Sequence, residues 1–308
     1  MSQHWSTRQE RGNLFVLRLV TRLIRYCPPW LIALLMRLVV LYFFITSPSE
    51  RRNIAEYQQH LRSWSGRSDL LPAFAPVYRQ FVAFGQAMTD RFAVWQGRLR
   101  YEHIVIHDPD GIHREMLYAK GRGQILICSH LGNTEISRAL VSHHKGLVLN
   151  ILIHSKHAQQ YNQVMADLGA DNDIRLLQVT DLDIDTMMML QQRVDNGEWI
   201  AIAADREPVR GEKVVQVPFL GENVSFPQGP WLMAGLLRAS VNTLFCTRQH
   251  GRYALHIERM SERIQWSRQD RDQVIHGWVQ RYAGRLEHVC MQAPLQWFNF
   301  YDFWKHHE

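Results

Sequence analysis

Two side chains suited to acid–base chemistry, His130 and Glu135, stand five positions apart in the segment Gly121–Leu140. A neutral imidazole accepts a proton from an attacking hydroxyl near pH 7. A carboxylate bonded to the other ring nitrogen fixes the tautomer and stabilises the imidazolium that forms. The pair is therefore suited to activating a hydroxyl group, which takes the place that serine holds in a hydrolase triad.

The same spacing occurs a second time, at His103 and Asp108. There the histidine falls within a predicted strand, and five residues of extended chain carry the partner about 16 Å away. His130 is instead followed by Gly132 and a predicted helix start, so the loop can fold the two side chains together. A histidine satisfied within the core remains the alternative for His130.

A strand, a tight loop and a helix are predicted to position His130. Gln124–Cys128 is an apolar run typical of a buried strand, and a turn follows that ends near Asn133. Asn133 or Thr134 is suited to cap the helix that begins near Glu135. His130 is thus expected at the carboxyl end of a strand, where α/β sheets bind their ligands.

Two charged residues, Asp205 and Arg206, follow a second predicted strand, Trp199–Ala203. They are expected to emerge at the same edge of the sheet as His130. A guanidinium there would bind a phosphate in a bidentate manner. We therefore predict that Asn133, Asp205 and Arg206 help to bind substrate. A helix cap and a surface salt bridge are the alternatives for these residues.

Short apolar runs rich in β-branched residues alternate with helical patterns along the rest of the chain. This alternation predicts an α/β layered domain with a largely parallel central sheet flanked by helices. Pro72 and Pro76 divide the helical stretch between Ser47 and Arg98. The further predicted strands are Tyr101–His107, Leu147–Ile153, Ile174–Val179, Val214–Val217, Val241–Cys246 and Tyr253–Ile257, and the predicted helices are Glu135–His144, His157–Leu168, Ile184–Asn196, Pro230–Ala239 and Gln269–Met291.

The segment Asn13–Cys27 has the pattern of a helix lying in a membrane interface. Arg18, Arg22 and Arg25 form a single basic stripe, and apolar residues fill much of the remaining surface. A helix packed on the surface of its own domain is the alternative.

A strongly apolar segment follows, Trp30–Thr46, interrupted only by Arg37. Its length is at the lower limit for crossing a hydrocarbon layer of about 30 Å. An arginine near the middle costs roughly 2.5–3.5 kcal/mol on insertion scales. The segment either spans thinly or enters and leaves one leaflet. We therefore predict a membrane-anchoring helical region over residues 1–50 and a catalytic domain over residues 51–308.

The composition is that of a globular protein, with 46% hydrophobic and 21% charged residues. The net charge of +6 suits a partner that carries phosphates, such as membrane headgroups, nucleic acid or an acidic carrier protein. Nucleic-acid binding explains the charge but not the apolar segment, and no recognition motif is present. His154 and His157 lack further ligands at a suitable spacing, so we predict no metal site.

Several ordered blocks of the chain resemble a known enzyme family. The stretch CSHLGNTEISRAL resembles the HxxxxD/E signature of the lysophospholipid and glycerolipid acyltransferase superfamily, and is most similar to the branch of lipid A late acyltransferases, where the acid is usually glutamate. The sequence around Asp205 and Arg206 departs from that branch. Further blocks that resemble the branch are HSKHAQQYNQVM, GEWIAIAADREPVRGEKVVQVPFLGENVSFPQGPWLMAGLLRASV and APLQWFNFYDFW.

The resemblance implies an O-acyltransferase with His130 as general base and Glu135 as its orienting partner. It implies a thioester of acyl carrier protein or coenzyme A as donor, with no metal or redox cofactor. The acceptor would be a membrane lipid, at the cytoplasmic side of a bacterial inner membrane. A lysophospholipid acyltransferase, a thioesterase and a non-catalytic lipid-binding or scaffold protein remain alternatives, and the residues do not identify the acceptor.

Overall fold

The computed structural model describes most of the chain. The predicted helix His157–Leu168 lies outside the described residues, as do most of the predicted helix Glu135–His144 and all of Asn13–Cys27 except its last residue. The described residues are 27–95, 98–117, 121–136, 141, 146–153, 173–179, 183–206 and 213–304.

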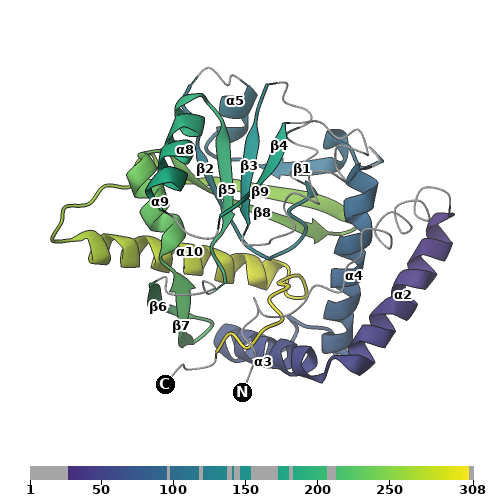
Figure 1. The fold of residues 1–308 in the computed structure, drawn as a ribbon. Helices are drawn as coiled ribbons and strands as arrows, with labels where there is room; N and C mark the ends of the chain where they lie inside the picture. The colour runs from purple at the N-terminus through teal and green to yellow at the C-terminus, as the bar shows by residue number, and fades with distance from the viewer. Residues whose placement is uncertain are drawn as a thin grey trace.

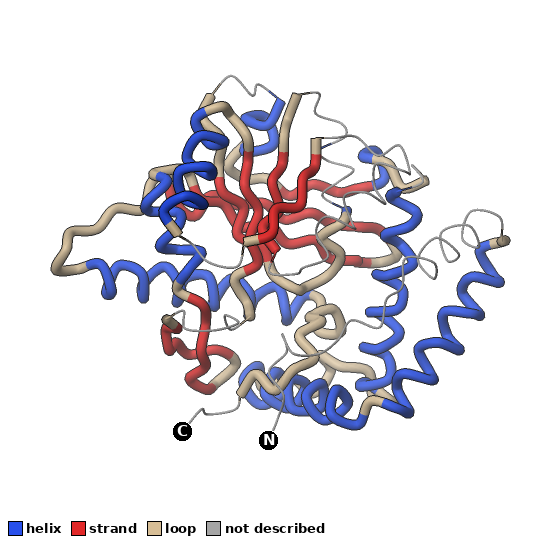
Figure 2. The backbone as a smooth tube through the Cα atoms, viewed as in Figure 1, coloured by secondary structure: helices blue, strands red, loops and turns tan. Residues whose placement is uncertain are grey.

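A seven-stranded sheet forms the centre of the described part, in the order β1-β9-β8-β2-β5-β3-β4 (Figures 1 and 2). Five neighbouring strands, from β8 to β4, run parallel, whereas β9 is antiparallel to β8 and β1 is parallel to β9. The predicted α/β domain with a largely parallel sheet is thereby confirmed. The strands are β1 (Ile104–His107), β2 (Ile125–Cys128), β3 (Leu149–Ile153), β4 (Ile174–Gln178), β5 (Trp199–Ala203), β8 (Val241–Gln249) and β9 (Arg252–Ser261).

The central strand β2 is buried on both faces, as its continuous apolar run predicts. Ile125 and Ile127 point into the larger hydrophobic cluster, together with residues of α9 and α10. Leu126 and Cys128 point into a second cluster on the opposite face. Because successive side chains of a strand alternate between faces, β2 joins the two halves of the core.

A small hairpin stands apart from the main sheet and corrects one predicted element. The strand predicted over Val214–Val217 extends through Pro218 as β6 (Val214–Phe219), and it pairs with β7 (Glu222–Pro227), which the sequence patterns did not indicate. Leu220 and Gly221 make the turn with φ of 49° and 92°. Two successive positive φ angles match the right-handed twist of a tight hairpin.

The helices pack on the sheet largely where the sequence predicts them. α10 crosses one face of the sheet in Figure 1 and buries one side against the core. One predicted strand, Tyr101–His107, begins instead with a 3₁₀ turn over Tyr101–His103. The described helices are α2 (Pro29–Thr46), α3 (Pro48–Ser65), α4 (Pro76–Trp95), α5 (Ile112–Leu117), α8 (Ile184–Asp195), α9 (Gly229–Leu237) and α10 (Arg271–Gln292).

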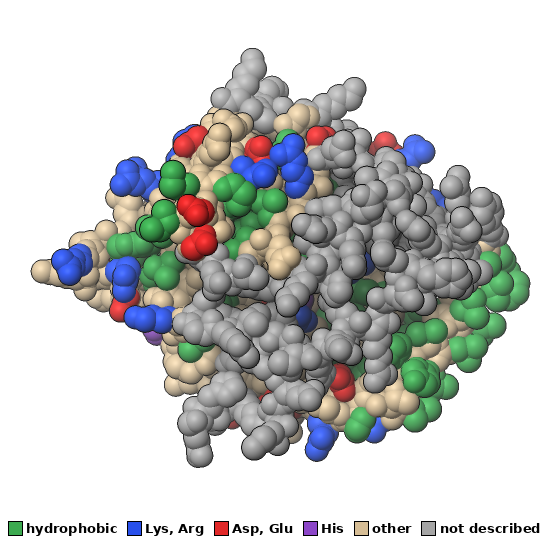
Figure 3. Space-filling model, viewed as in Figure 1, with side chains coloured by type: hydrophobic (Ala, Val, Ile, Leu, Met, Phe, Trp, Pro, Cys, Tyr) green, Lys and Arg blue, Asp and Glu red, His purple; other side chains and the backbone are tan. Residues whose placement is uncertain are grey.

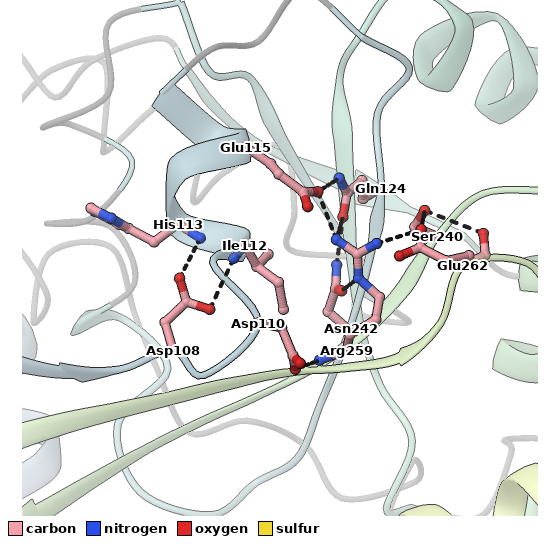
Figure 4. A network of polar contacts seen from close by, with 10 residues as sticks. All are labelled: Asp108, Asp110, Ile112, His113, Glu115, Gln124, Ser240, Asn242, Arg259 and Glu262. Atoms are coloured by element: carbon pink, nitrogen blue, oxygen red, sulfur yellow. Dashed lines mark hydrogen bonds and ion pairs between the residues drawn. The ribbon is translucent and has the colours of Figure 1, made fainter.

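A network of polar side chains centred on Arg259 ties α5 to the start of β2 and β8 (Figure 4). Its guanidinium donates to Glu115, Glu262 and the side-chain oxygen of Asn242. Asn242 in turn donates to Gln124 at 2.8 Å. The network lies at the edge of the sheet where β2 begins, opposite the edge where His130 is placed, so it stabilises the fold away from the site.

The two N-terminal described helices, α2 and α3, meet at a sharp bend of 92°. Taken singly, no helix among the described residues is long and apolar enough to cross a membrane. Among the described helices, the bent pair α2 and α3 is the only candidate, by length and composition alone.

One face of α2 packs on the domain and the other is open. Val40 is buried with Phe81 of α4, and Met36 and Phe44 pack beside them. Figure 3 shows hydrophobic side chains gathered on the side of the molecule where α2 lies. The exposed large apolar residues of α2 are Trp30, Leu34, Leu35, Leu38, Val39, Leu41, Tyr42, Phe43 and Ile45.

Candidate active site

The loop that carries His130 makes a tight turn at the end of β2. Gly132 has φ of +72°, and a Cβ added there would lie 1.7 Å from the carbonyl oxygen of Cys246. The backbone N–H of Gly132 donates to Gln296 O at 2.7 Å, and that of Asn133 donates to Cys246 O at 3.0 Å. Only glycine permits this backbone conformation and this close approach to β8.

His130 contacts Asp205 through two hydrogen bonds. The ring nitrogen Nδ1 lies 2.8 Å from Asp205 Oδ1, and the backbone N–H of His130 donates to Asp205 Oδ2 at 2.8 Å. The side chain of His130 is about one-third exposed, whereas that of Asp205 is fully buried. Assigning the Nδ1 proton to this bond leaves Nε2 with its lone pair free to accept a proton.

The register of two adjacent parallel strands explains why His130 and Asp205 are in contact. β2 pairs with β5, and Cys128 stands opposite Ala203. Each chain then continues by two residues, to His130 and to Asp205 respectively. The backbone N–H of Ala204 still donates to Cys128 O at 3.0 Å, so the two segments remain side by side beyond the sheet.

Asp205 is buried as a carboxylate with a donor on each oxygen. Trp297 Nε1 donates to Oδ2 at 2.9 Å, in addition to the two bonds from His130. Burial acts to raise the pKa of Asp205, but the attraction of His130 and the hydrogen bonds from His130 and Trp297 outweigh it and hold the pKa below its usual value. Asp205 is therefore ionised at neutral pH.

The charges around His130 favour its neutral form. Burial lowers the pKa of His130 below the ordinary value, and the guanidinium of Arg206 lowers it further. Asp205 opposes this shift by attraction and by its hydrogen bond. The net pKa remains below the ordinary value of about 6.5, so the imidazole is a base at neutral pH.

Arg206 lies beside the pair and is held by the C-terminal segment. Its Nε donates to Asn299 Oδ1 at 3.1 Å, and Nη2 donates to Phe298 O at 3.4 Å. Asn299 in turn donates to the backbone carbonyl of Asp205 at 2.9 Å. The structure thus brings three of the predicted site residues together, namely His130, Asp205 and Arg206.

The two other predicted site residues lie further along the loop. Asn133 is buried, with Nδ2 donating to Ala87 O of α4 at 3.1 Å and Oδ1 accepting the backbone N–H of Glu135 at 3.2 Å. Its amide therefore ties the loop to α4 and caps the following turn. Glu135 is partly buried in that turn. The carboxylate that bonds Nδ1 of His130 belongs to Asp205, and the role of Glu135 stays a prediction.

The sequence patterns did not predict that C-terminal residues contact His130 and Asp205. Trp297 and Asn299 are both buried and donate to Asp205, and the backbone N–H of Phe298 donates to His130 O at 2.9 Å. The available signal is the aromatic block APLQWFNFYDFW, whose polar residues alternate with large rings.

A cavity of about 310 Å³ opens beside the loop, between α4 and the C-terminal segment. Small residues of α4 and of the loop leave room for it, and its wall is partly apolar. The residues that line the cavity include Ala83, Gln86, Ala87, Gly132, Arg248 and Phe298. Among the described residues, no group of histidine, cysteine or acidic side chains is arranged to hold a metal ion.

Comparison with known proteins identifies one family. A family model described as bacterial lipid A biosynthesis acyltransferase matches residues 77–306, which is well over half of the chain. The matched range contains the His130 loop, Asp205 and the C-terminal segment. No curated protein matches the chain.

Proposed function

The chain belongs to the family of bacterial lipid A biosynthesis acyltransferases, and from this we propose that it moves a fatty acyl group from a thioester to a hydroxyl of a lipid acceptor, with His130 as general base. The observation that carries the proposal is the contact between His130 and the buried carboxylate of Asp205. That contact leaves Nε2 as the proton acceptor in a partly exposed position.

The transfer proceeds without a residue of the chain becoming acylated. The acceptor oxygen attacks the thioester carbonyl while its proton passes to Nε2 of His130. The tetrahedral intermediate collapses by breaking the carbon–sulfur bond, and the imidazolium returns the proton to the leaving thiolate. Asp205 stabilises the imidazolium during this interval, because its buried charge lies 2.8 Å from Nδ1.

Glu135 retains a proposed role as a second carboxylate of the site. The HxxxxE spacing supports a dyad of His130 and Glu135, whereas the bond at Nδ1 supports Asp205 as the orienting partner. The two roles are compatible if Asp205 fixes the ring and Glu135 acts on the substrate side. Separate substitutions of the two carboxylates distinguish these roles.

The donor is proposed to be a thioester of acyl carrier protein or of coenzyme A. Both carry a phosphopantetheine arm, and Arg206 is suited to bind a phosphate near the pair. The cavity beside the loop is partly apolar and is suited to part of an acyl chain. The acceptor is a membrane lipid, with a lysophospholipid as the alternative to a glycolipid or a polyene lipid.

The chain is proposed to work at the cytoplasmic side of a bacterial inner membrane. The open apolar face of α2 supports attachment to the membrane, because the transfer of exposed apolar side chains into a lipid leaflet is favourable. Residues 1–50 would serve as the anchor and residues 51–308 as the catalytic domain. The inner face of α2 packs on α4, so the two parts are in contact.

Mass spectrometry of the lipids of cells that express each variant tests the proposal. The wild-type protein is compared with His130→Ala, Asp205→Asn and Glu135→Ala at matched protein levels. We expect one lipid to lose an acyl-sized mass in His130→Ala. Release of free acyl chains without a new ester would indicate a thioesterase. A His130→Ala profile that matches wild type but differs from a deletion would overturn the mechanism and favour a scaffold role.

A further inference from the structure

The C-terminal segment Gln296–Asn299 lies against the His130 loop along its whole length. Leu131 and Trp297 form an antiparallel bridge, and the backbone N–H of Phe298 donates to His130 O at 2.9 Å. Gln296 accepts the N–H of Gly132 at 2.7 Å. The segment therefore contacts both of the elements that carry His130 and Asp205.

We infer that Trp297 is a positioning residue for the proposed transfer: its indole N–H fixes the carboxylate of Asp205 so that Oδ1 faces Nδ1 of His130. This inference rests on the proposed function and adds a residue to its machinery. Trp297 donates to Asp205 and acts through that carboxylate.

The hydrogen bonds at Asp205 show why a third donor matters. The His130 ring holds Oδ1, and Oδ2 is shared between the His130 backbone and Trp297 Nε1. With all three donors in place, the carboxylate cannot rotate about its Cβ–Cγ bond without breaking three hydrogen bonds in a buried site, whereas without Trp297 only the two bonds to His130 oppose the rotation. A buried carboxylate that loses a donor is left with less compensation for its desolvation.

Trp297 is itself held firmly enough to act as a reference point. Its ring packs between Tyr57, Phe219 and Phe303, at centroid distances of 5.0, 5.3 and 5.0 Å. Its backbone carbonyl accepts the side-chain amide of Gln80 at 2.8 Å. Because the ring and the backbone of Trp297 are both held in place, its indole N–H keeps the carboxylate of Asp205 in one orientation.

Two other buried tryptophans show that the core does not require such a bond. Trp231 and Trp304 are buried, and among the described residues their indole nitrogens have no hydrogen-bond partner. Trp304 belongs to the same aromatic cluster as Trp297, at a centroid distance of 6.0 Å. The bond from Trp297 to Asp205 is therefore a specific feature and not a general property of buried indoles here.

Trp304 supplies a matched control for the test. Both Trp297→Phe and Trp304→Phe replace an indole by a phenyl ring in the same aromatic cluster, but only Trp297→Phe removes a donor from Asp205. The full chain in detergent is treated with diethyl pyrocarbonate across a pH series, and peptide mass spectrometry follows modification of His130. This reagent reacts with neutral imidazole, so the midpoint reports the protonation of His130 without any turnover.

We expect the His130 midpoint to rise by about half a pH unit or more in Trp297→Phe, because a carboxylate with one donor fewer attracts the imidazolium more strongly. Below the midpoint, His130 would then react about threefold more slowly or worse. Trp304→Phe should leave the midpoint unchanged. In the transfer assay, kcat should fall with little change in KM, and the acid limb of its pH profile should move by the same amount.

Equal midpoints in wild type, Trp297→Phe and Trp304→Phe would overturn the inference. A shifted midpoint in a protein that transfers no acyl group would overturn the proposed function alone. If Trp297→Phe does not fold, the indole N–H resonances of the unaltered protein provide the test. One of them should move with pH at the His130 midpoint and lose that movement in His130→Ala, and the absence of such a resonance contradicts the inference.

Discussion

Asp205 accepts two hydrogen bonds from a single residue, His130, one from the imidazole ring and one from the backbone N–H, each at 2.8 Å. The carboxylate therefore holds both the imidazole ring and the backbone N–H of His130, and this fixes the ring relative to its own backbone. Because Asp205 is fully buried, its charge acts on the imidazole with little screening by water. The pair is fixed before any substrate arrives.

Asp205→Asn should lower kcat strongly while leaving the fold intact. An amide oxygen can keep the two donors at the Oδ2 position, which are the His130 backbone and Trp297, but the amide then presents an N–H to Nδ1. The ring thereby loses the acceptor that sets its tautomer. We expect kcat to fall roughly 10²–10⁴-fold with KM changed much less, as general-base positioning predicts. Steady-state kinetics with a purified acyl thioester and lipid extract measure this.

Glu135→Gln provides the comparison, alone and combined with Asp205→Asn. If Asp205 orients His130 and Glu135 acts elsewhere, the two losses should multiply in the double variant. If both carboxylates act through the same bond, the double variant should be no slower than the worse single one. A wild-type rate for Asp205→Asn would rule out its orienting role.

Gly132→Ala should disrupt the His130 loop. Its φ of +72° and the 1.7 Å approach of an added Cβ to Cys246 O leave no room for a side chain. We expect a loss of stability of roughly 2–4 kcal/mol and a loss of transfer activity.

Thermal or urea unfolding measures the stability change. Gly284→Ala in α10 is the control, because an added Cβ there meets nothing within 4 Å. That substitution should raise stability by about 0.5–1 kcal/mol, since alanine favours a helix interior. Equal effects from the two substitutions would contradict the proposed loop geometry.

Acid should destabilise the fold through a histidine outside the candidate active site. Burial, together with repulsion from the neighbouring His107 and His288, lowers the pKa of His256 to about 4. Its ring stacks on that of His107 at 4.7 Å, and its Nε2 is buried without a partner among the described residues. The folded state therefore binds a proton at His256 less readily than the unfolded state does.

The direction of the effect follows from linkage. An unfolded histidine titrates near pH 6.5, so the stability gained from neutral His256 is complete above that pH and is lost as pH falls towards 4. Between pH 7 and pH 4.5, the free energy of unfolding should therefore decrease by about 1–2 kcal/mol less in His256→Phe than in wild type, after allowance for partial exposure. Melting temperatures between pH 7 and pH 4.5 measure it, with the exposed His276→Phe as control. If the melting temperature of His256→Phe falls with pH as steeply as that of wild type, His256 is not a source of the acid destabilisation.

Charge on the open face of α2 should release the protein from membranes. Leu34 and Leu38 are 48% and 55% exposed, so Leu34→Glu with Leu38→Glu leaves the core intact. Each leucine contributes roughly 1.5–3 kcal/mol when it enters hydrocarbon, and we expect binding to anionic vesicles to weaken about a hundredfold or more.

Flotation of the full chain with vesicles measures that binding. Ala55→Glu with Gln59→Glu on α3 is the matched control, because both positions are exposed and have the same spacing and the same final charge. Equal release by both pairs would indicate an electrostatic effect in place of insertion.

Local patterns predict the strands and helices well because burial imposes a periodicity on neighbouring residues. The apolar run of β2 and the strand Trp199–Ala203 are examples, and both lie where the sequence indicates. The hairpin partner β7 was missed because Pro218 and the turn at Gly221 suggest a loop, and only the pairing of two short strands resolves the ambiguity.

The contacts within the candidate site could not be predicted from local patterns. The sequence places His130 and Asp205 at the carboxyl ends of strands, but it does not reveal that these strands are neighbours in register. The spacing from His130 to Glu135 is visible along the chain, whereas the contact with Asp205 spans 75 positions. Trp297 is further still, and its contribution follows from tertiary packing alone.

Chain order gives the C-terminal segment a consequence for biosynthesis. α2 leaves the ribosome long before Trp297, because the segment that closes over the His130 loop is translated after every described helix and strand. A nascent chain therefore contains α2, His130 and Asp205 before it contains the indole that donates to Asp205. Translation that stops short of Trp297 would leave Asp205 without its indole donor, so these contacts are complete only after Trp297 has been made.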